Sequence, residues 1–320
     1  MNRPLVSVIL PTYNCGRFVA DAIDSVLSQS YQPIEVVVVD DGSTDDTLDV
    51  VARFGDRVRV FTQANAGPAA ARNRAVSEAR GEYLAFLDGD DLWLPGHTET
   101  LMGQFERQPD CRVVYGDWLV WHPDEDGGFP PLQVPAPILA PRVDPLGSGW
   151  LYSRLLFDSV IHIIASVIHR SVFDAVGGFD QTLRTGSDYD FWLKVSRRHP
   201  AVKLDVPVAV YRQNHSSVTY TLRKENNAYR LLKRAIETYG LVDDGGHAVP
   251  ASAARRRLAA LAFLHGYRHY WDGDADVAVQ SFRQALSHHP WQPKAAAYLL
   301  ASLARCWGLP RPTRGRGTAR

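Results

Sequence analysis

This chain of 320 residues has few cysteines and lysines and no formal net charge. Its three cysteines, an odd number without C-x-x-C spacing, exclude a disulfide framework and a zinc site of the usual kind. Thirty-five basic and 35 acidic residues give a formal net charge of zero, so no overall field would recruit nucleic acid or anionic lipid. The positive residues are nearly all arginine, which we interpret as a bias of genome composition.

Long apolar runs are missing as well. A membrane-spanning helix needs about 18 or more apolar residues, and the longest candidate, residues 160–168, is interrupted by His162 and Ser166. The first ten residues lack the apolar core and the cleavage site of a signal peptide. We therefore expect a cytoplasmic protein, with peripheral association at the inner face of a membrane left open. The hydrophobic content of 45% is ordinary for a folded protein with a sizeable core.

The first third of the chain alternates between strand and helix patterns. Continuous β-branched runs predict strands, and apolar residues three to four apart predict the helices between them. Ser43 or Thr44 is expected to cap one further helix. This order predicts a mainly parallel, Rossmann-like sheet flanked by helices, with the ligand at the carboxyl ends of the strands. The expected strands are 6–10, 34–39, 58–61 and 83–87, and the expected helices are 18–28 and 69–80.

The next stretch is less regular. Prolines and glycines crowd residues 121–149 and predict an irregular excursion, a candidate lid or acceptor loop. Regular structure is expected to resume after it and to end in a pair of short strands. The expected elements are a helix around 150–157, a strand near 163–169, a helix over 188–198 and a strand pair over 202–211.

Three segments follow from these patterns: an α/β domain over residues 1–220, a helical region over 221–309, and a basic tail over 310–320 that is expected to be disordered. Part of the helical region resembles one tetratricopeptide repeat. A single repeat does not bury its own face, so its helices should pack on their neighbours; a small helical cap is the alternative to a peptide-binding array. The residues at the repeat spacing are Gly266, Ala278, Phe282, Ala285 and Pro290, with Gly273 and Asp274 at the turn.

Two aspartates after the fourth expected strand carry the strongest chemical signal. Asp88 and Asp90 stand two apart in an extended segment, so their carboxylates face the same way. Adjacent like charges are costly unless a cation neutralises them. Oxygen ligands suit Mg²⁺ or Mn²⁺, which commonly also binds substrate phosphates. A solvated acidic turn ahead of the next helix is the alternative interpretation.

Polar residues at the other strand ends favour the metal interpretation. Pro11, Thr12 and Tyr13 follow the first strand, where the tyrosine ring can stack on a nucleobase. Asp40 follows the second strand with free acceptors for base N–H groups, and Arg72 can reach a base or phosphate from its helix. Each residue alone has a structural explanation: a core aromatic, a turn residue, a surface ion pair. Their occurrence at successive strand ends indicates a nucleotide site.

In this order the motifs resemble those of the family-2 inverting glycosyltransferases. The resemblance implies the GT-A fold, here with an all-α C-terminal extension, and covers roughly residues 5–220. The matching segments are 6–14, 39–45, 67–73 and 86–91, followed by 177–180, 187–193 and 211–212.

The resemblance also implies roles for individual residues. Asp188 matches the catalytic base, and Ser187 stands where a glutamate usually precedes it, which changes the charge beside the base. His215 lies where some relatives place a histidine near the metal, with an ordinary loop histidine as the alternative. The implied Mn²⁺ or Mg²⁺ ligands are Asp88, Asp90 and His215, and the implied nucleotide-sugar site comprises Pro11, Thr12, Tyr13, Asp40, Arg72, Asp88 and Gly89.

The implied reaction moves a sugar from a nucleoside-diphosphate donor, commonly UDP in this family, to a hydroxyl of a glycan or lipid-linked acceptor in surface polysaccharide synthesis. A dehydrogenase would show G-x-G-x-x-G, and a nucleotidyltransferase a glycine-rich basic loop; residues 11–16 show neither. The remaining alternative is a catalytically degenerate scaffold that acts through the helical region. Four aromatic residues are candidates for an acceptor cleft or for core packing: Trp118, Trp121, Trp150 and Tyr152.

Overall fold

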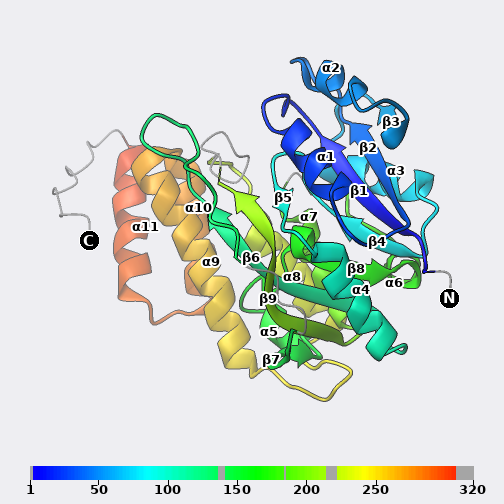
Figure 1. Ribbon diagram of the computed structural model, residues 1–320. Helices are drawn as coiled ribbons and strands as arrows, with labels where there is room; N and C mark the ends of the chain where they lie inside the picture. The colour runs from blue at the N-terminus through cyan, green and yellow to red at the C-terminus, as the bar shows by residue number, and fades with distance from the viewer. Residues whose placement is uncertain (1–2, 136–140, 184, 214–221, 308–320) are drawn as a thin grey trace. The chain divides into compact units, whose positions relative to one another are not determined.

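The computed structural model describes residues 3–135, 141–183, 185–213 and 222–307 (Figure 1). The chain divides into two compact units, Met1–Val218 with Val242–Ala248, and Thr219–Leu241 with Val249–Arg320. His215 and the tail 310–320 lie outside the described residues. Within the described ranges, no helix combines the length and the apolar character that a membrane crossing requires.

The first four main strands are parallel, as their sequence patterns predict. Strand β1 lies between β2 and β4, and β3 pairs with the outer edge of β2. Every residue of β1 is buried, as is typical of a strand covered on both faces. These elements are β1 (Val6–Thr12), α1 (Val19–Leu27), β2 (Ile34–Asp40), α2 (Thr47–Ala52), β3 (Arg59–Thr62), α3 (Pro68–Glu78) and β4 (Tyr83–Phe86).

The second half of the sheet is mixed, which departs from the mainly parallel prediction. The strand order is β3-β2-β1-β4-β8-β6-β9-β5, and β7 pairs with β9. Strand β8 is antiparallel to both β4 and β6, whereas β6 and β9 are parallel. The added elements are β5 (Leu92–Trp93), α4 (His97–Arg107), β6 (Val113–Trp121), β7 (Val143–Gly149), α5 (Tyr152–Leu155), β8 (Ser166–His169), α6 (Arg170–Val176), α7 (Ser187–Ser196) and β9 (Ala201–Arg212).

Three local predictions are wrong. Residues 202–211 belong to one long strand, β9, rather than to a strand pair. Residues 143–149 form β7 despite their glycine and proline content, because pairing with β9 supplies partners for the backbone. Helix α2 is capped by neither Ser43 nor Thr44: its N-cap is Asp46, without a capping side-chain hydrogen bond, and the Ser43 hydroxyl donates to Asp40 instead.

The second unit is helical, as predicted. Figure 1 shows α9, α10 and α11 side by side. Helices α9 and α10 meet at the predicted turn, where the Asp274 side chain accepts a hydrogen bond of 2.9 Å from the backbone N–H of Asp276. Gly266 permits a close approach, since a Cβ there would lie 3.1 Å from Phe282. The hairpin is present, whereas its identity as a tetratricopeptide repeat stays a prediction. The helices are α8 (Asn227–Tyr239), α9 (Ala251–Asp272), α10 (Ala275–His288) and α11 (Pro293–Cys306).

All three cysteines are free thiols. Cys15 and Cys111 are buried in the first unit, and Cys306 is exposed at the end of α11. Burial raises the pKa of the Cys15 thiol to about 12, and it raises the pKa of Cys111 as well. The two buried thiols therefore stay protonated and serve as small apolar side chains.

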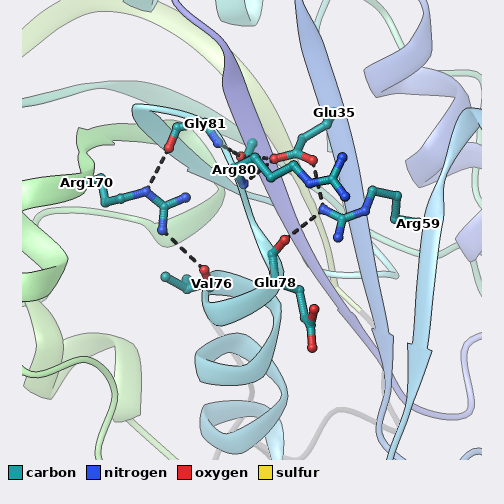
Figure 2. A network of polar contacts seen from close by, with 8 residues as sticks. Glu35, Arg59, Val76, Glu78, Arg80, Gly81 and Arg170 are labelled. Carbon is teal, nitrogen blue, oxygen red and sulfur yellow. Dashed lines mark hydrogen bonds and ion pairs between the residues drawn. The ribbon is translucent and has the colours of Figure 1, made fainter.

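A polar network joins the first strands to the end of α3 (Figure 2). The Glu35 carboxylate accepts hydrogen bonds from the Ser7 hydroxyl at 2.5 Å, from the backbone N–H of Arg80 at 2.5 Å and from Arg59 at 3.0 Å. Arg59 also donates to the carbonyl oxygen of Glu78 at 2.7 Å. One carboxylate thus fixes β1, β2, β3 and the chain after α3 to one another.

Replacing Glu35 by Gln is expected to lower the free energy of unfolding by about 1–3 kcal/mol, because charged hydrogen bonds are lost at a largely buried position. Burial alone would raise the pKa of Glu35, but the hydrogen bonds from Ser7, Arg80 and Arg59 together lower it below 4.5. The carboxylate therefore stabilises the fold above pH 4.5, and this contribution is lost as the pH falls through the lowered pKa.

Urea unfolding across this pH range measures the effect. The difference between the wild type and Glu35→Gln should be largest at neutral pH and shrink in acid. The matched control is Glu78→Gln, since Glu78 takes part in the network through its backbone carbonyl. A difference that stays constant with pH would contradict the assignment.

Candidate functional site

The turn after β4 lies directly against the end of β1. A Cβ on Gly89 would lie 2.8 Å from Cys15 Sγ, 3.2 Å from Thr12 Cγ2 and 3.4 Å from the carbonyl oxygen of Pro11. Only glycine therefore fits without displacing the loop after β1. The adjacent parallel strands β1 and β4 thus bring together Pro11, Thr12 and Gly89, which the sequence places 77 positions apart or more.

Tyr13 is a surface residue, so the alternative interpretation as a core aromatic does not hold for it. Its side chain is 50% exposed, which leaves the ring accessible for stacking. The next residue, Asn14, has a φ of 49° and accepts a hydrogen bond of 2.8 Å from the backbone N–H of Thr44. Its own backbone N–H donates to the Ser43 hydroxyl at 2.9 Å. The loops after β1 and β2 are therefore tied together beside the tyrosine.

Asp40 does not offer the free acceptors that the sequence analysis expected. It is buried, and its Oδ1 accepts hydrogen bonds from the hydroxyls of Thr12 and Ser43. Its Oδ2 accepts from the backbone N–H groups of Gly42 at 3.1 Å and Ser43 at 3.0 Å. A nucleobase N–H would have to share these oxygens, because the carboxylate already orders its own loop.

The neighbouring carboxylate, Asp41, orders the loop that leads into α3. Its Oδ1 accepts from the Gln63 side chain at 2.7 Å and from the backbone N–H of Ala66 at 2.9 Å. Its Oδ2 accepts from the backbone N–H of Gly67 at 2.7 Å. Gly67 has a φ of 94° and is the N-cap of α3, so Asp41 fixes the start of the helix that carries Arg72.

Arg72 forms an ion pair with one predicted site carboxylate and interacts electrostatically with a second. Its side chain is 7% exposed, and Nη2 donates to Asp88 Oδ1 at 2.5 Å. Burial would lower the pKa of Arg72, but Asp88 and then Asp188 raise it above its ordinary value. The guanidinium is therefore within electrostatic reach of both carboxylates, and the alternative of a surface ion pair is wrong.

An aromatic cluster explains why distant segments meet here. Phe86 at the end of β4 contacts Phe179 with ring centroids 5.7 Å apart, and Phe179 stacks on Phe191 of α7 at 4.5 Å. Asn73, next to Arg72, donates to the carbonyl oxygen of Phe179 at 2.8 Å and accepts from its N–H at 2.9 Å. The elements that carry Asp88, Arg72 and Asp188 are thereby packed on one cluster.

Asp188 occupies the first turn of α7. The helix follows Gly186, the N-cap, which has a φ of 76°, and Asp188 is its second residue. The side chain remains partly exposed, so it is accessible to a bound molecule.

The aspartates after β4 carry more negative charge than their surroundings neutralise. Burial, and then Asp88, raises the pKa of Asp90 to about 6. Burial, and then Asp90 and Asp88, raises the pKa of Asp91 well above its ordinary value, although Asp91 accepts a hydrogen bond of 2.7 Å from the backbone N–H of Arg212. Surplus negative charge on oxygen ligands fits a divalent cation of the Mg²⁺ or Mn²⁺ type.

The described residues supply only part of a metal coordination sphere. In residues 3–135, 141–183, 185–213 and 222–307, no three His, Cys, Asp or Glu side chains converge as a metal-binding group. Since such ions commonly keep waters and phosphate oxygens as ligands, one or two carboxylates are sufficient on the protein side. Asp88 and Asp90 fit this requirement, and the role of His215 stays a prediction.

Sequence analysis missed the role of Arg212. Its side chain is 2% exposed and pairs with Asp21 at 3.1 Å. The guanidinium lies over three aromatic rings. The distances from its Cζ atom to the ring centroids are 4.4 Å for Phe18, 5.0 Å for Trp121 and 5.3 Å for Phe129. It therefore joins the start of α1, the end of β6 and the segment after β6. Arg212 belongs to a recognised motif, but nothing in the sequence marks these partners.

Two further aromatic predictions are resolved by burial. Tyr152 is fully buried, so it packs in the core rather than lining a cleft. Trp118 remains partly exposed and contacts the ring of His162 at 5.0 Å. His162 is the second residue that sequence analysis missed, because in the sequence it only interrupts an apolar run.

Residues 7–149 match the family model described as Glycosyl transferase family 2. The chain belongs to this family. A relative from Rickettsia felis, described as an uncharacterized glycosyltransferase, is 32% identical to this family-2 chain over 218 residues, which make up 67% of this chain and 35% of that protein. The chain spans about a third of the length of the first three curated relatives it matches.

Solved structures show the same architecture. The family-2 chain resembles S. aureus TarS 1-349 in complex with UDP-GlcNAc, with a TM-score of 0.63 and 18% identity, over 94% of this chain and 87% of that one. It also resembles the mannosyltransferase PcManGT from Pyrobaculum calidifontis in complex with GDP-Man and Mn²⁺, with a TM-score of 0.56 and 20% identity, over 96% and 88% of the two chains. The predicted GT-A fold with a helical extension is confirmed.

Proposed function

We propose that this chain is an inverting glycosyltransferase that moves a sugar from a nucleoside-diphosphate sugar to a hydroxyl of a glycan or lipid-linked acceptor in surface polysaccharide synthesis. The observation that supports it most is the position of Arg72, which interacts with Asp88 from the β4 turn and with Asp188 from α7. Carboxylates from segments 100 residues apart in sequence thus both raise the pKa of one buried cation.

The donor would lie across the carboxyl ends of β1, β2 and β4. The exposed ring of Tyr13 is free to stack on the base, while Asp40 offers shared acceptors at the end of β2. Arg72 supplies fixed positive charge near the phosphates, where a guanidinium matches phosphate geometry. We propose a uridine diphosphate sugar, in line with the UDP-GlcNAc bound by TarS.

The acceptor would enter beside Asp188. Its hydroxyl proton passes to the Asp188 carboxylate while its oxygen attacks the anomeric carbon. The bond between that carbon and the phosphate oxygen breaks, its electron pair stays on the diphosphate, and the configuration at carbon inverts. Residues from the segment between β6 and β7 would help to exclude water, since Arg17 donates to the carbonyl oxygen of Gly127 at 3.1 Å and Arg212 lies over Phe129.

Asp88 and Asp90 would hold Mn²⁺ or Mg²⁺, which when bound would offset the negative charge of the departing diphosphate. Arg72 acts in the same direction without a metal, because its charge is held in place by Asp88. Its position also explains why burial of this arginine is tolerated: two carboxylates compensate for its lost hydration.

A panel of UDP-, GDP- and dTDP-sugars, tested by thermal shift with Mn²⁺ and then for slow donor hydrolysis, would check the proposal. We expect one nucleotide sugar to raise the melting temperature more than its free diphosphate and to be hydrolysed. The same panel with a chelator is the control. If no nucleotide sugar binds or is hydrolysed, the scaffold alternative is favoured instead.

A further inference from the structure

His162 has a buried ring nitrogen for which the described part of the chain supplies no hydrogen-bond partner. Its Nδ1 has no hydrogen-bond partner among the described residues, although buried polar atoms in native proteins nearly always have one. The side chain as a whole remains partly exposed. The position therefore has no structural explanation in terms of hydrogen bonding within the protein.

Two aromatic rings hold the imidazole in place. The ring centroid of Trp118 in β6 lies 5.0 Å from that of the imidazole, and the ring centroid of Tyr211 in β9 lies 5.2 Å from it. In the register of these parallel strands Trp118 lies opposite Ala209, two residues before Tyr211, so both rings project from the same face of the sheet. Together the three side chains form a partly exposed aromatic wall, with the imidazole as its polar element.

The wall lies beside the acidic turn after β4, because the backbone N–H of Arg212, the residue after Tyr211, donates to Asp91 at 2.7 Å. Burial lowers the pKa of His162, while Asp188 and then Asp88 oppose this and Arg72 adds to it. The ring is thus within electrostatic reach of all three site residues, and it is neutral at neutral pH. A neutral imidazole has one donor and one acceptor nitrogen, which matches a sugar hydroxyl, itself both donor and acceptor.

We propose that His162 determines donor specificity by hydrogen-bonding a hydroxyl of the transferred sugar, which packs on Trp118 and Tyr211. The inference rests on the proposed function. In a single displacement the transferred sugar lies between the leaving diphosphate and the base. The charges of Asp88 and Asp188, assigned to the two ends, both act on the His162 ring, which favours the transferred sugar over the acceptor. Pockets of this kind combine aromatic walls with a few placed polar groups.

The test compares His162→Phe and His162→Asn with the wild type. Phenylalanine keeps a ring between Trp118 and Tyr211 but removes both nitrogens, whereas asparagine keeps a donor and an acceptor. Calorimetry would measure the affinity for the nucleotide sugar selected by the panel and for its free nucleoside diphosphate. We expect His162→Phe to lower the affinity for the nucleotide sugar about tenfold and to leave the affinity for the diphosphate nearly unchanged. His162→Asn should restore part of the lost affinity.

A second readout is the ratio of kcat/KM between sugars on the same nucleotide, for example glucose, galactose and N-acetylglucosamine on UDP. A contact with the sugar changes this ratio in His162→Phe, whereas a purely structural role lowers all values together. The matched control is His199→Phe. His199 Nε2 is also buried without a hydrogen-bond partner in the described ranges, but the charged groups that act on it are Arg198 and Arg112 rather than site carboxylates.

Equal losses of affinity for the nucleotide sugar and for the free diphosphate in His162→Phe would overturn the inference. An unchanged affinity together with an unchanged ratio of kcat/KM between sugars would also overturn it. Either result leaves the proposed function standing, provided that the wild type still binds and hydrolyses its donor. A wild type that binds no nucleotide sugar would overturn the proposed function and this inference together, so the two failures are distinguishable.

Discussion

Replacing Asp188 by Asn should lower turnover by about 10²- to 10⁴-fold, the usual contribution of a positioned general base. Asparagine keeps the shape of the side chain at the start of α7 but does not accept the proton of the acceptor hydroxyl. Donor affinity should stay within about twofold of the wild type, because the proton transfer occurs only in the transition state. Steady-state transfer assays and calorimetry with the donor separate these two effects.

The control for Asp188→Asn is the same change at Asp56, an exposed carboxylate in the turn after α2. That variant should keep wild-type turnover. Transfer by Asp188→Asn at a rate close to the wild type would show that another group takes the proton. A parallel loss of donor affinity would instead mean that Asp188 acts on the binding site through Arg72.

Replacing Asp90 by Asn is expected to have opposite effects on stability and on donor binding. Without metal, the raised pKa of about 6 means that an ionised Asp90 destabilises the fold. The neutral amide removes this cost, so the chelator-treated variant should be more stable than the wild type at pH 8, by at most about 3 kcal/mol at 1.36 kcal/mol per pKa unit. Donor binding in the presence of Mn²⁺ should fall steeply, because one of two predicted ligands is lost.

The effect of Asp90 on the free energy of unfolding depends on pH. Since its folded pKa is raised, the penalty is absent in acid, where Asp90 is protonated in the fold, and it grows as the pH rises from 3.8 through about 6. The stability gain of Asp90→Asn should therefore grow across this window and be complete above it. Thermal unfolding with a chelator, at several pH values, measures it. A variant that is less stable than the wild type at pH 8, or that binds donor with Mn²⁺ normally, would refute the assignment.

The first half of the fold is readable from the sequence because its strands are covered on both faces. The strand at Ile34–Asp40 contains four successive valines, and the predicted range 34–39 agrees with its bounds to within one residue. By contrast, β7 contains Pro145 and Gly147, which no local pattern assigns to a strand. Its pairing with β9 is a tertiary effect, and single-sequence patterns do not carry such effects.

The candidate site divides in the same way. Asp88 and Arg72 were predicted from their places at strand and helix ends, and the structure joins them in an ion pair. Asp40 stands where predicted, yet hydrogen bonds within its own loop occupy both of its oxygens. His162 lies in a loop and has no motif of its own, and its position depends on Trp118 of β6 and Tyr211 of β9.

The distribution of thiols has a practical consequence for labelling. The thiolate is the form of cysteine that attacks a maleimide reagent, and burial suppresses this form at both Cys15 and Cys111. Cys306 is exposed at the end of α11, although its own pKa is raised by partial burial and by Asp276, so mildly alkaline buffer speeds its reaction. The wild-type chain thus accepts one fluorophore on its helical unit without any engineered cysteine, a reporter for fluorescence anisotropy when candidate acceptors are added.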